Sequence, residues 1–180
     1  MFKKLSLIFL LLSILIISGC VKNSEGKEKQ EVGTTNNYEG ASLKIGVVGN
    51  EEKLPEFSNI SYQNRELDDL VNNQEENFDA LIITNEAFSE ADKDQFVEYF
   101  NKVKYPVFFY EAKGISDDAF LEKGVTLESS KINSSAYIRG YVNKEKERVK
   151  WVLHLPDNKN KSDKENIFIQ LFEIIEEINR

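Results

Sequence analysis

The sequence predicts an α/β fold: a single doubly wound, mostly parallel sheet that ends in an antiparallel C-terminal hairpin and a C-terminal amphipathic helix. Short apolar runs rich in β-branched and aromatic residues recur through residues 43–110, and polar segments with helical periodicity separate them. After residue 134 the pattern changes to strict alternation of polar and apolar residues. Continuous apolar runs are typical of strands that a parallel sheet buries on both faces, whereas alternation is typical of a hairpin.

The first part of the domain contains three strong strand candidates and two helices. The strong candidates are Leu43–Val48, Ala80–Thr84 and Val107–Tyr110, and weaker strands are expected near residues 60–63 and 125–127. Helices are expected over residues 66–73 and 89–104, where apolar side chains recur on one side. Ser89 and Asp92 have the spacing of a capping arrangement, and Pro106 prevents the second helix from continuing. Strand and helix therefore alternate, as in doubly wound sheets.

The C-terminal part departs from this alternation. Residues 135–143 and 148–156 both alternate, and the charged turn 144–147 joins them into an expected hairpin. The expected cross-strand pairs are Ile138 with Leu153, Gly140 with Trp151, and Val142 with Val149. A slip by one residue would turn Lys150 toward the core, so burial fixes this register.

The final helix is expected over residues 163–179, with Ser162 and Glu165 as its capping box. Its apolar stripe consists of Ile167, Phe168, Leu171, Ile174, Ile175 and Ile178. The opposite face carries Glu173, Glu176 and Glu177, whereas a helix lying on a membrane would carry Lys or Arg there. The stripe is therefore expected to pack on the core of the domain.

An export signal is expected at the start of the chain. Lys3 and Lys4 precede an apolar run over residues 5–17, and residues 17–20 read Ile-Ser-Gly-Cys. This pattern resembles the lipobox of bacterial lipoproteins, which implies that Cys20 receives diacylglycerol, with palmitate among its fatty acids, and becomes the first residue after cleavage. An uncleaved membrane anchor is the alternative, but the run is shorter than the roughly 20 apolar residues that span a bilayer.

The expected organisation follows from that signal. Residues 1–19 form the signal peptide, residues 20–42 the lipidated Cys20 and a polar tether, and residues 43–180 one domain. Two acyl chains would hold the protein stably on the cell membrane, with the domain facing the extracytoplasmic side of the cell envelope. Because Cys20 is the only cysteine, that domain is expected to fold without a disulfide.

Charge narrows the expected partners. The chain has a formal net charge of −8, and removal of the signal peptide with Lys3 and Lys4 makes it more negative by two. A domain this acidic is repelled by nucleic acid, so nucleic acid is not an expected partner. The expected partners are the membrane, through Cys20, and a protein or another envelope component.

One segment of the domain resembles a known family. Residues 78–111 contain a strand, Asn85, a helix that begins at Ser89 and a further strand, and in this they are similar to class I amidotransferase-like folds and their non-catalytic relatives. The resemblance implies the α/β fold. Catalytic members of that family place a nucleophilic cysteine at a tight turn after a later strand, and this sequence has no cysteine after Cys20. The resemblance therefore implies no amidotransferase activity.

A first candidate site lies at the carboxyl ends of the parallel strands, where open α/β sheets bind ligands. The polar residues expected there are Asn50, Asn85, Glu86 and Glu111. Together they could bind a polyol, an amine or a cation, and Glu86 with Glu111 is the one carboxylate pair that suggests a glycosidase-like hydrolase. Acidic loops commonly carry such residues, so an ordinary solvated rim is the alternative.

A second candidate site lies on the hairpin. Tyr137, Arg139, Tyr141 and Lys150 are expected on its outward face, with Arg148 and His154 beside them. Arg and Tyr are enriched at protein interfaces, so this basic and aromatic strip is a candidate partner surface. The alternative is an ordinary solvated strand face.

Other chemistries lack the residues that they require. His154 is the only histidine, so neither a histidine metal cluster nor the paired-histidine motif of zinc proteases is present, and no cofactor is expected. His154 is expected on the surface of its strand. Two functions remain: a non-catalytic binding or accessory lipoprotein, and a small-ligand-binding protein or hydrolase that uses the strand-end residues.

Overall fold

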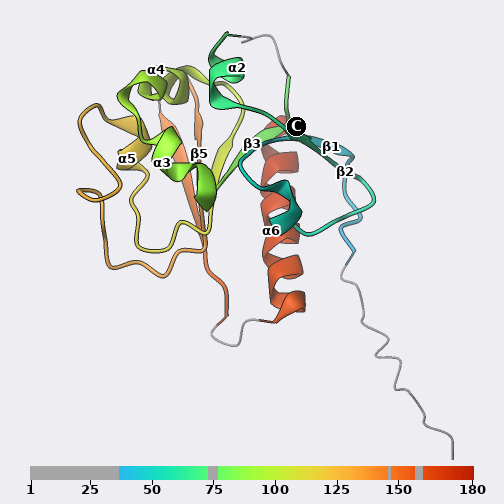
Figure 1. Ribbon diagram of the computed structural model, residues 1–180. Coiled ribbons are helices and arrows are strands. Elements are labelled where there is room, and N and C mark those ends of the chain that lie inside the picture. The colour runs from blue at the N-terminus through green and yellow to red at the C-terminus, as the bar shows by residue number, and fades with distance from the viewer. Residues whose placement is uncertain (1–36, 73–76, 146, 157–159) are drawn as a thin grey trace, which may run out of the picture. The chain divides into compact units, whose positions relative to one another are not determined.

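Six strands form one mixed sheet in the order β2-β1-β3-β4-β5-β6 (Figure 1). The computed structural model describes residues 37–72, 77–145, 147–156 and 160–180, and all of them belong to one compact unit. The strands are β1 Leu43–Val48, β2 Ile60–Asn64, β3 Ala80–Thr84, β4 Val107–Tyr110, β5 Ile138–Asn143 and β6 Arg148–Leu153. The helices are α2 Leu67–Asn72, α3 Phe88–Ala91, α4 Asp94–Lys102, α5 Asp118–Leu121 and α6 Lys161–Asn179, with short 3-10 turns η1 Glu51–Lys53 and η2 Asn85–Ala87.

The first four strands are parallel and the last two are antiparallel, as the sequence predicts. β1 pairs with β2 and β3, and β3 pairs with β4, all in parallel. Every residue of β3 and β4 is buried, which explains their continuous apolar sequences. β5 is antiparallel to both β4 and β6. The predicted hairpin register is confirmed, since Gly140 pairs with Trp151 and the two flanking pairs follow.

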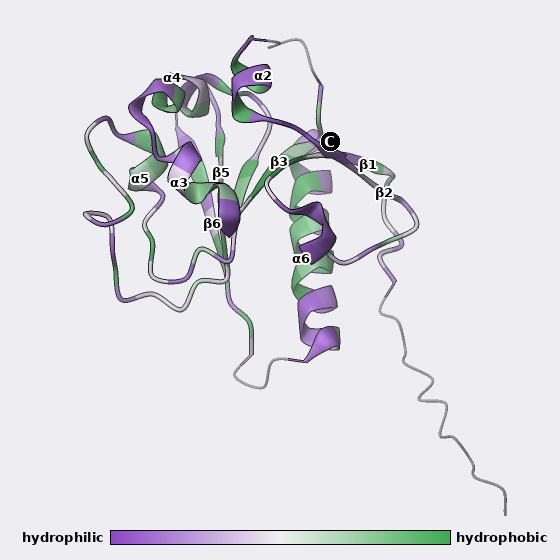
Figure 2. Ribbon diagram, in the orientation of Figure 1, coloured by the Kyte–Doolittle hydropathy of each residue, from purple (hydrophilic) through white to green (hydrophobic). Residues whose placement is uncertain are grey.

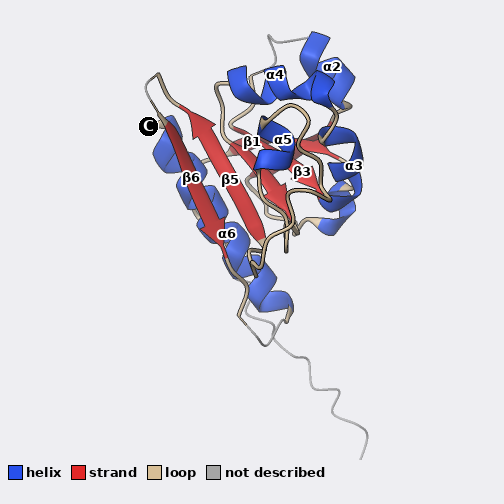
Figure 3. Ribbon diagram, turned by 90° about the vertical axis from the view of Figure 1, so that its left-hand side faces the viewer, coloured by secondary structure: helices blue, strands red, loops and turns tan. Residues whose placement is uncertain are grey.

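The two faces of the sheet are covered by different elements. Buried side chains of α2, α3, α4 and α5 pack on one face, where the rings of Phe109 and Phe120 stack with their centroids 4.0 Å apart. The other face is covered by α6, which buries Phe168 and Phe172 among others, together with the segment that joins β1 to β2. Figure 3 shows the sheet between α6 and the remaining helices, and Figure 2 shows the apolar residues concentrated in the strands and on part of α6.

The predicted helix over residues 89–104 is interrupted. The chain forms η2, α3 and α4 there, and Lys93 between α3 and α4 has an extended ψ of 135°. Ser89 and Asp92 do not form the predicted N-terminal cap, because Ser89 lies inside α3 and Asp92 is the C-cap residue of that helix. Instead, the Asp92 carboxylate accepts a hydrogen bond from the Leu127 amide at 3.1 Å, and the Asp94 carboxylate accepts one from Gly124 at 2.8 Å.

These contacts also explain why the predicted strand at residues 125–127 is absent. The segment forms turns that are bound through side chains to α3 and α4, so its amides do not join the sheet. The weak strand predicted at residues 60–63 is confirmed as β2.

The last helix begins two residues earlier than predicted. Asn160 is its N-cap and accepts a hydrogen bond from the Asp163 amide at 2.9 Å, while the Asp163 carboxylate accepts one from the Asn160 amide at 3.1 Å. The capping box is therefore Asn160 with Asp163, and Ser162 lies inside the first turn. Four residues of the predicted stripe are buried together with Phe172: Ile167, Phe168, Leu171 and Ile175. Ile174 and Ile178 are only partly buried.

The folded domain extends further toward the N-terminus than residue 43. Tyr38, which the sequence interpretation placed in the tether, is only 3% exposed. Its ring lies 5.3 Å from that of Phe172, and its hydroxyl donates a hydrogen bond to Glu176 at 3.0 Å. Burial, followed by this hydrogen bond, raises the pKa of Tyr38 to about 12. The end of the predicted tether is thus part of the core under α6.

Candidate functional site

The predicted strand-end residues lie at the carboxyl ends of β1, β3 and β4, which are adjacent strands. Asn50 follows β1 and is the N-cap of η1, because its side chain accepts a hydrogen bond from the Glu52 amide at 3.0 Å. The Asn50 amide donates to the Thr84 hydroxyl, also at 3.0 Å, which ties η1 to the end of β3. Asn85 is the first residue of η2 and is exposed.

Glu86 has a partner that the sequence did not reveal. Lys53 at the end of η1 forms an ion pair with it, and each of the two side chains is 39% exposed. The two residues are distant in sequence, and only the adjacency of β1 and β3 brings them together. The ion pair offsets the charge of Glu86, so this carboxylate attracts a cation or an amine less than an unpaired one would.

Glu111 is oriented differently from the other three candidates. It follows β4 with a φ of 61°, the one positive φ of a non-glycine residue in the described chain. Its carboxylate accepts a hydrogen bond from the Tyr137 hydroxyl at 3.2 Å, and that hydroxyl lies 2.9 Å from the hydroxyl of Tyr110. Burial is the main cause that raises the pKa of both tyrosines, and their hydroxyls stay protonated at neutral pH. The described contacts therefore join Glu111 to two neutral tyrosines, rather than to Glu86.

The predicted strip on the hairpin is not an exposed surface. Tyr141 is 0% exposed and Tyr137 only 8%, and the Arg139 side chain is 15% exposed. Tyr141 packs in the layer under α4 and α5 and donates its hydroxyl to the Phe100 carbonyl at 2.8 Å. The expectation of an outward face was wrong because the segment between β4 and β5, together with α4 and α5, covers that side of β5.

A buried acid organises the basic residues of this region. Asp117, at the start of α5, is 7% exposed and forms ion pairs with Lys150 at 2.7 Å and with Arg139 at 3.7 Å. Arg139 also donates to the Ser134 hydroxyl at 3.0 Å, while its Nε is buried without a hydrogen-bond partner. Only Lys150 among the three charged groups reaches solvent well, with 47% of its side chain exposed. Two cations thus share one carboxylate, which leaves this group of three side chains with one excess positive charge.

His154 is exposed, as predicted, and its Nδ1 lies 3.1 Å from the Ser135 hydroxyl. Among the residues that the structure describes, no group of three or more His, Cys, Asp or Glu side chains is arranged to hold a metal ion. Within the same residues, none of the helices has the length and apolar character needed to span a membrane. Cys20 and the rest of the predicted signal peptide and lipobox lie outside the described residues.

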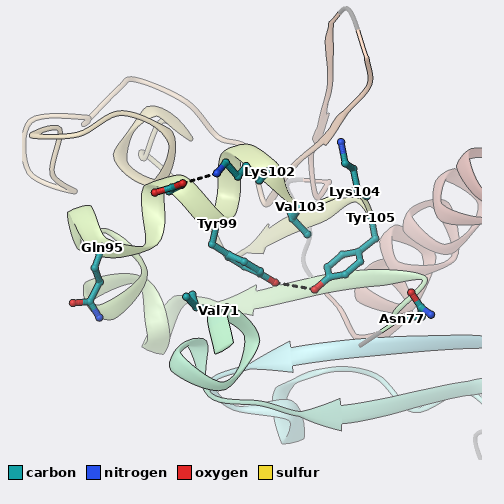
Figure 4. Close-up of a pocket in the computed structure, with 9 residues that line it drawn as sticks. Val71, Asn77, Gln95, Tyr99, Lys102, Val103, Lys104 and Tyr105 are labelled. Atoms are coloured by element: carbon teal, nitrogen blue, oxygen red, sulfur yellow. Dashed lines mark hydrogen bonds and ion pairs between the residues drawn. The ribbon is translucent and has the colours of Figure 1, made fainter. Parts of the chain in front are cut away.

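One cavity of about 500 Å³ lies beside α4, at the amino ends of β3 and β4 (Figure 4). Val71, Gln95 and Tyr105 are among its lining residues, and the hydroxyls of Tyr99 and Tyr105 are 2.8 Å apart in its wall. Open α/β sheets bind ligands at the opposite, carboxyl ends of their strands. None of the predicted site residues lines this cavity.

A second cavity of about 390 Å³ lies between the segment that follows β6 and the first half of α6. His154 and Pro156 form one wall, and Ile167, Ile169 and Gln170 are among the helix residues of the other. It adjoins the end of an edge strand, a place that the sequence interpretation did not single out as a site. No family model, no curated protein and no solved structure matches this chain.

Proposed function

We propose that this chain is a lipid-anchored, extracytoplasmic membrane protein whose α/β domain binds a partner and catalyses no reaction. The observation that carries the proposal is the sequence of residues 1–20, in which a basic start, a short apolar run and Ile-Ser-Gly-Cys occur in the order that lipoprotein processing requires. The polar segment that follows Cys20 would let the folded domain stand away from the membrane surface.

The state of the strand-end residues supports a non-catalytic role. Asn50 caps η1, Glu86 is paired with Lys53, and Glu111 accepts a hydrogen bond from Tyr137. A pair of catalytic carboxylates needs one acid and one base that face a common substrate. Here Glu86 and Glu111 are engaged with different neighbours, so their internal contacts account for both residues without a reaction.

Lipidation is tested by replacing Cys20 in the full chain. In a bacterium that processes lipoproteins, the unsubstituted chain is expected to incorporate a labelled fatty acid and to remain in the membrane fraction after a high-salt wash. Cys20→Ser removes the acceptor thiol, so the label and the membrane retention should both be lost.

The matched control restores a thiol outside the lipobox. The double variant Cys20→Ser with Ser24→Cys keeps one cysteine in the chain, but it should also lack the fatty acid, because small residues must directly precede the acceptor. Labelling of either variant, or an unlabelled parent chain in the soluble fraction, would contradict lipid anchoring at Cys20.

A further inference from the structure

β6 is an edge strand, and its outer side is open to another strand. The order of the sheet ends at β6, which pairs only with β5 among the described strands. The Lys144 amide donates to the Glu147 carbonyl at 2.9 Å, so these two residues form a hydrogen-bonded pair of the hairpin. Hydrogen-bonded pairs alternate along an antiparallel ladder. The main-chain groups of Val149, Trp151 and Leu153 therefore face β5, and those of Arg148, Lys150 and Val152 face outward.

The side chains of these outward-bonding residues form a positive strip. Lys150 and Val152 are exposed. The Lys150 side chain is 47% accessible to solvent, and the Val152 residue is 43% accessible. Lys150 shares the Asp117 carboxylate with Arg139, and Arg148 is bound by the neutral side chains of Asn101 and Asn143. Arg139 and Lys150 thus share one buried acid here, although the chain as a whole carries a formal charge of −8.

The other face of β6 presents apolar side chains. Trp151 and Leu153 are only partly buried against the layer under α6, and so are Leu155 and Ile169. The 390 Å³ cavity beside α6 begins where β6 ends. Asp163 and Glu173 line that cavity together with Ile167 and Ile169, so it is of mixed polarity. A strand laid along β6 would therefore meet Lys150 on one face and the partly buried side chains of Trp151 and Leu153 on the other.

We infer that the open edge of β6 binds an extended acidic segment of a partner protein by strand addition. The segment pairs with the main-chain groups of Arg148, Lys150 and Val152, because these are the free donors and acceptors of the edge. Its acidic side chains lie beside Lys150, and its alternate, apolar side chains lie beside Trp151 and Leu153. The inference rests on the proposed function as a binding protein and names the surface that does the binding.

Charge selects this occupant over a second copy of the chain. Pairing of two β6 strands would bring the Arg148 and Lys150 side chains of one copy close to those of the other, and like charges near each other across a ladder are destabilising. An acidic segment instead brings carboxylates close to Lys150, which shares its one described acidic partner, Asp117, with Arg139.

The single tryptophan of the chain provides a direct probe, because Trp151 lies on β6 itself. The full chain in mild detergent is titrated with an end-blocked peptide of about eight alternating Glu and Val residues. The fluorescence of Trp151 should change and saturate. A peptide of alternating Lys and Val should bind at least about tenfold more weakly, and added salt should weaken the acidic peptide.

Val152→Pro tests the role of the edge main chain. The Val152 amide points away from β5, so proline removes an outward donor without removing a hydrogen bond of the sheet. Binding of the acidic peptide should weaken at least about tenfold, whereas Val152→Thr, which keeps the amide, should bind as the parent does. If Val152→Pro does not fold, amide exchange on the parent chain replaces it, and the peptide should protect the amides of Arg148, Lys150 and Val152.

Three results would overturn the inference: no binding of the acidic peptide, equal binding of the two peptides, or unchanged binding by a folded Val152→Pro. Dimerisation of the chain through β6 would also overturn it. Repeating the titration with Cys20→Ser separates this inference from lipid anchoring, because the peptide must bind whether or not the chain is lipidated.

Discussion

Asp117 is the residue on which the packing of the β4–β5 segment against the hairpin depends. Its carboxylate is nearly buried and neutralises Arg139, whose side chain is itself mostly buried. Removing one member of a buried ion pair leaves the other charge without compensation in a poorly hydrated site.

Asp117→Asn is therefore expected to lower the free energy of unfolding by about 3 kcal/mol, measured by urea denaturation. Asp118→Asn is the matched control, because the neighbouring Asp118 carboxylate accepts a hydrogen bond from Ser116 and forms no described ion pair. The control should lose about 1 kcal/mol or less. Equal losses in the two variants would show that Arg139 does not depend on Asp117.

The same residues show why the candidate sites were only partly predictable. Alternation in β5 correctly separates Arg139 and Tyr141 from Ile138 and Gly140, but period-two patterning does not say whether both faces are covered. Arg and Tyr are compatible with an exposed face and also with a face closed by distant segments. Asp117 belongs to no motif, and its role follows from a long-range contact that residue spacing does not encode.

At the scale of elements, the N-terminus of α6 offers a direct test of the corrected cap. Asn160→Ala removes the side-chain acceptor for the Asp163 amide and should lower the free energy of unfolding by about 1 kcal/mol. Ser162→Ala, the position expected from sequence, should cost clearly less, because Ser162 is within the first turn. A larger loss for Ser162→Ala than for Asn160→Ala in urea denaturation would indicate that Ser162 is the cap.

The cap was misplaced because several residues near it can serve as caps. Asn160, Ser162 and Asp163 all favour helix N-termini, so composition alone permits a start at either place. By contrast, the strands β1, β3 and β4 were predicted with their observed ends, because burial on both faces produces short, mostly apolar runs with polar residues at their ends. The break between α3 and α4 depends on Asp92 and Asp94 binding a segment that is remote in sequence.

Gly140 in β5 lies between two large aromatic residues, one on each neighbouring strand. A β-carbon there would overlap the ring of Phe108 on the neighbouring β4, and Trp151 pairs with Gly140 from the other side. The predicted pairing of Gly140 with Trp151 was correct because the turn 144–147 and the burial of one face of the hairpin set the register. The contact with Phe108 was not predictable, since the sequence did not establish that β4 and β5 are neighbours.

For the molecule as a whole, buried tyrosines make the fold sensitive to alkaline pH. Burial is the first cause that raises the pKa of Tyr38, to about 12, and burial also raises the pKa of Tyr62, Tyr110, Tyr137 and Tyr141. The folded state thus favours the protonated hydroxyls more than the unfolded state does. Their contribution to stability is complete below pH 10, the ordinary tyrosine pKa, and is lost as pH rises through the folded values.

Urea denaturation at a series of pH values should show the free energy of unfolding falling from about pH 10 upward. Tyr38→Phe removes one contributing group and leaves every lysine in place, so its fall should be shallower than that of the parent. Parallel pH dependence in the two proteins would mean that Tyr38 titrates alike in both states.

The order in which the chain is made gives the placement of α6 a further consequence. All six strands precede this helix in sequence, yet α6 supplies most of the apolar cover for one entire side of them. Until α6 has been synthesised, that side remains open to water and the domain lacks half of its core. The contacts between α6 and the sheet are therefore the last part of the core that can form during synthesis.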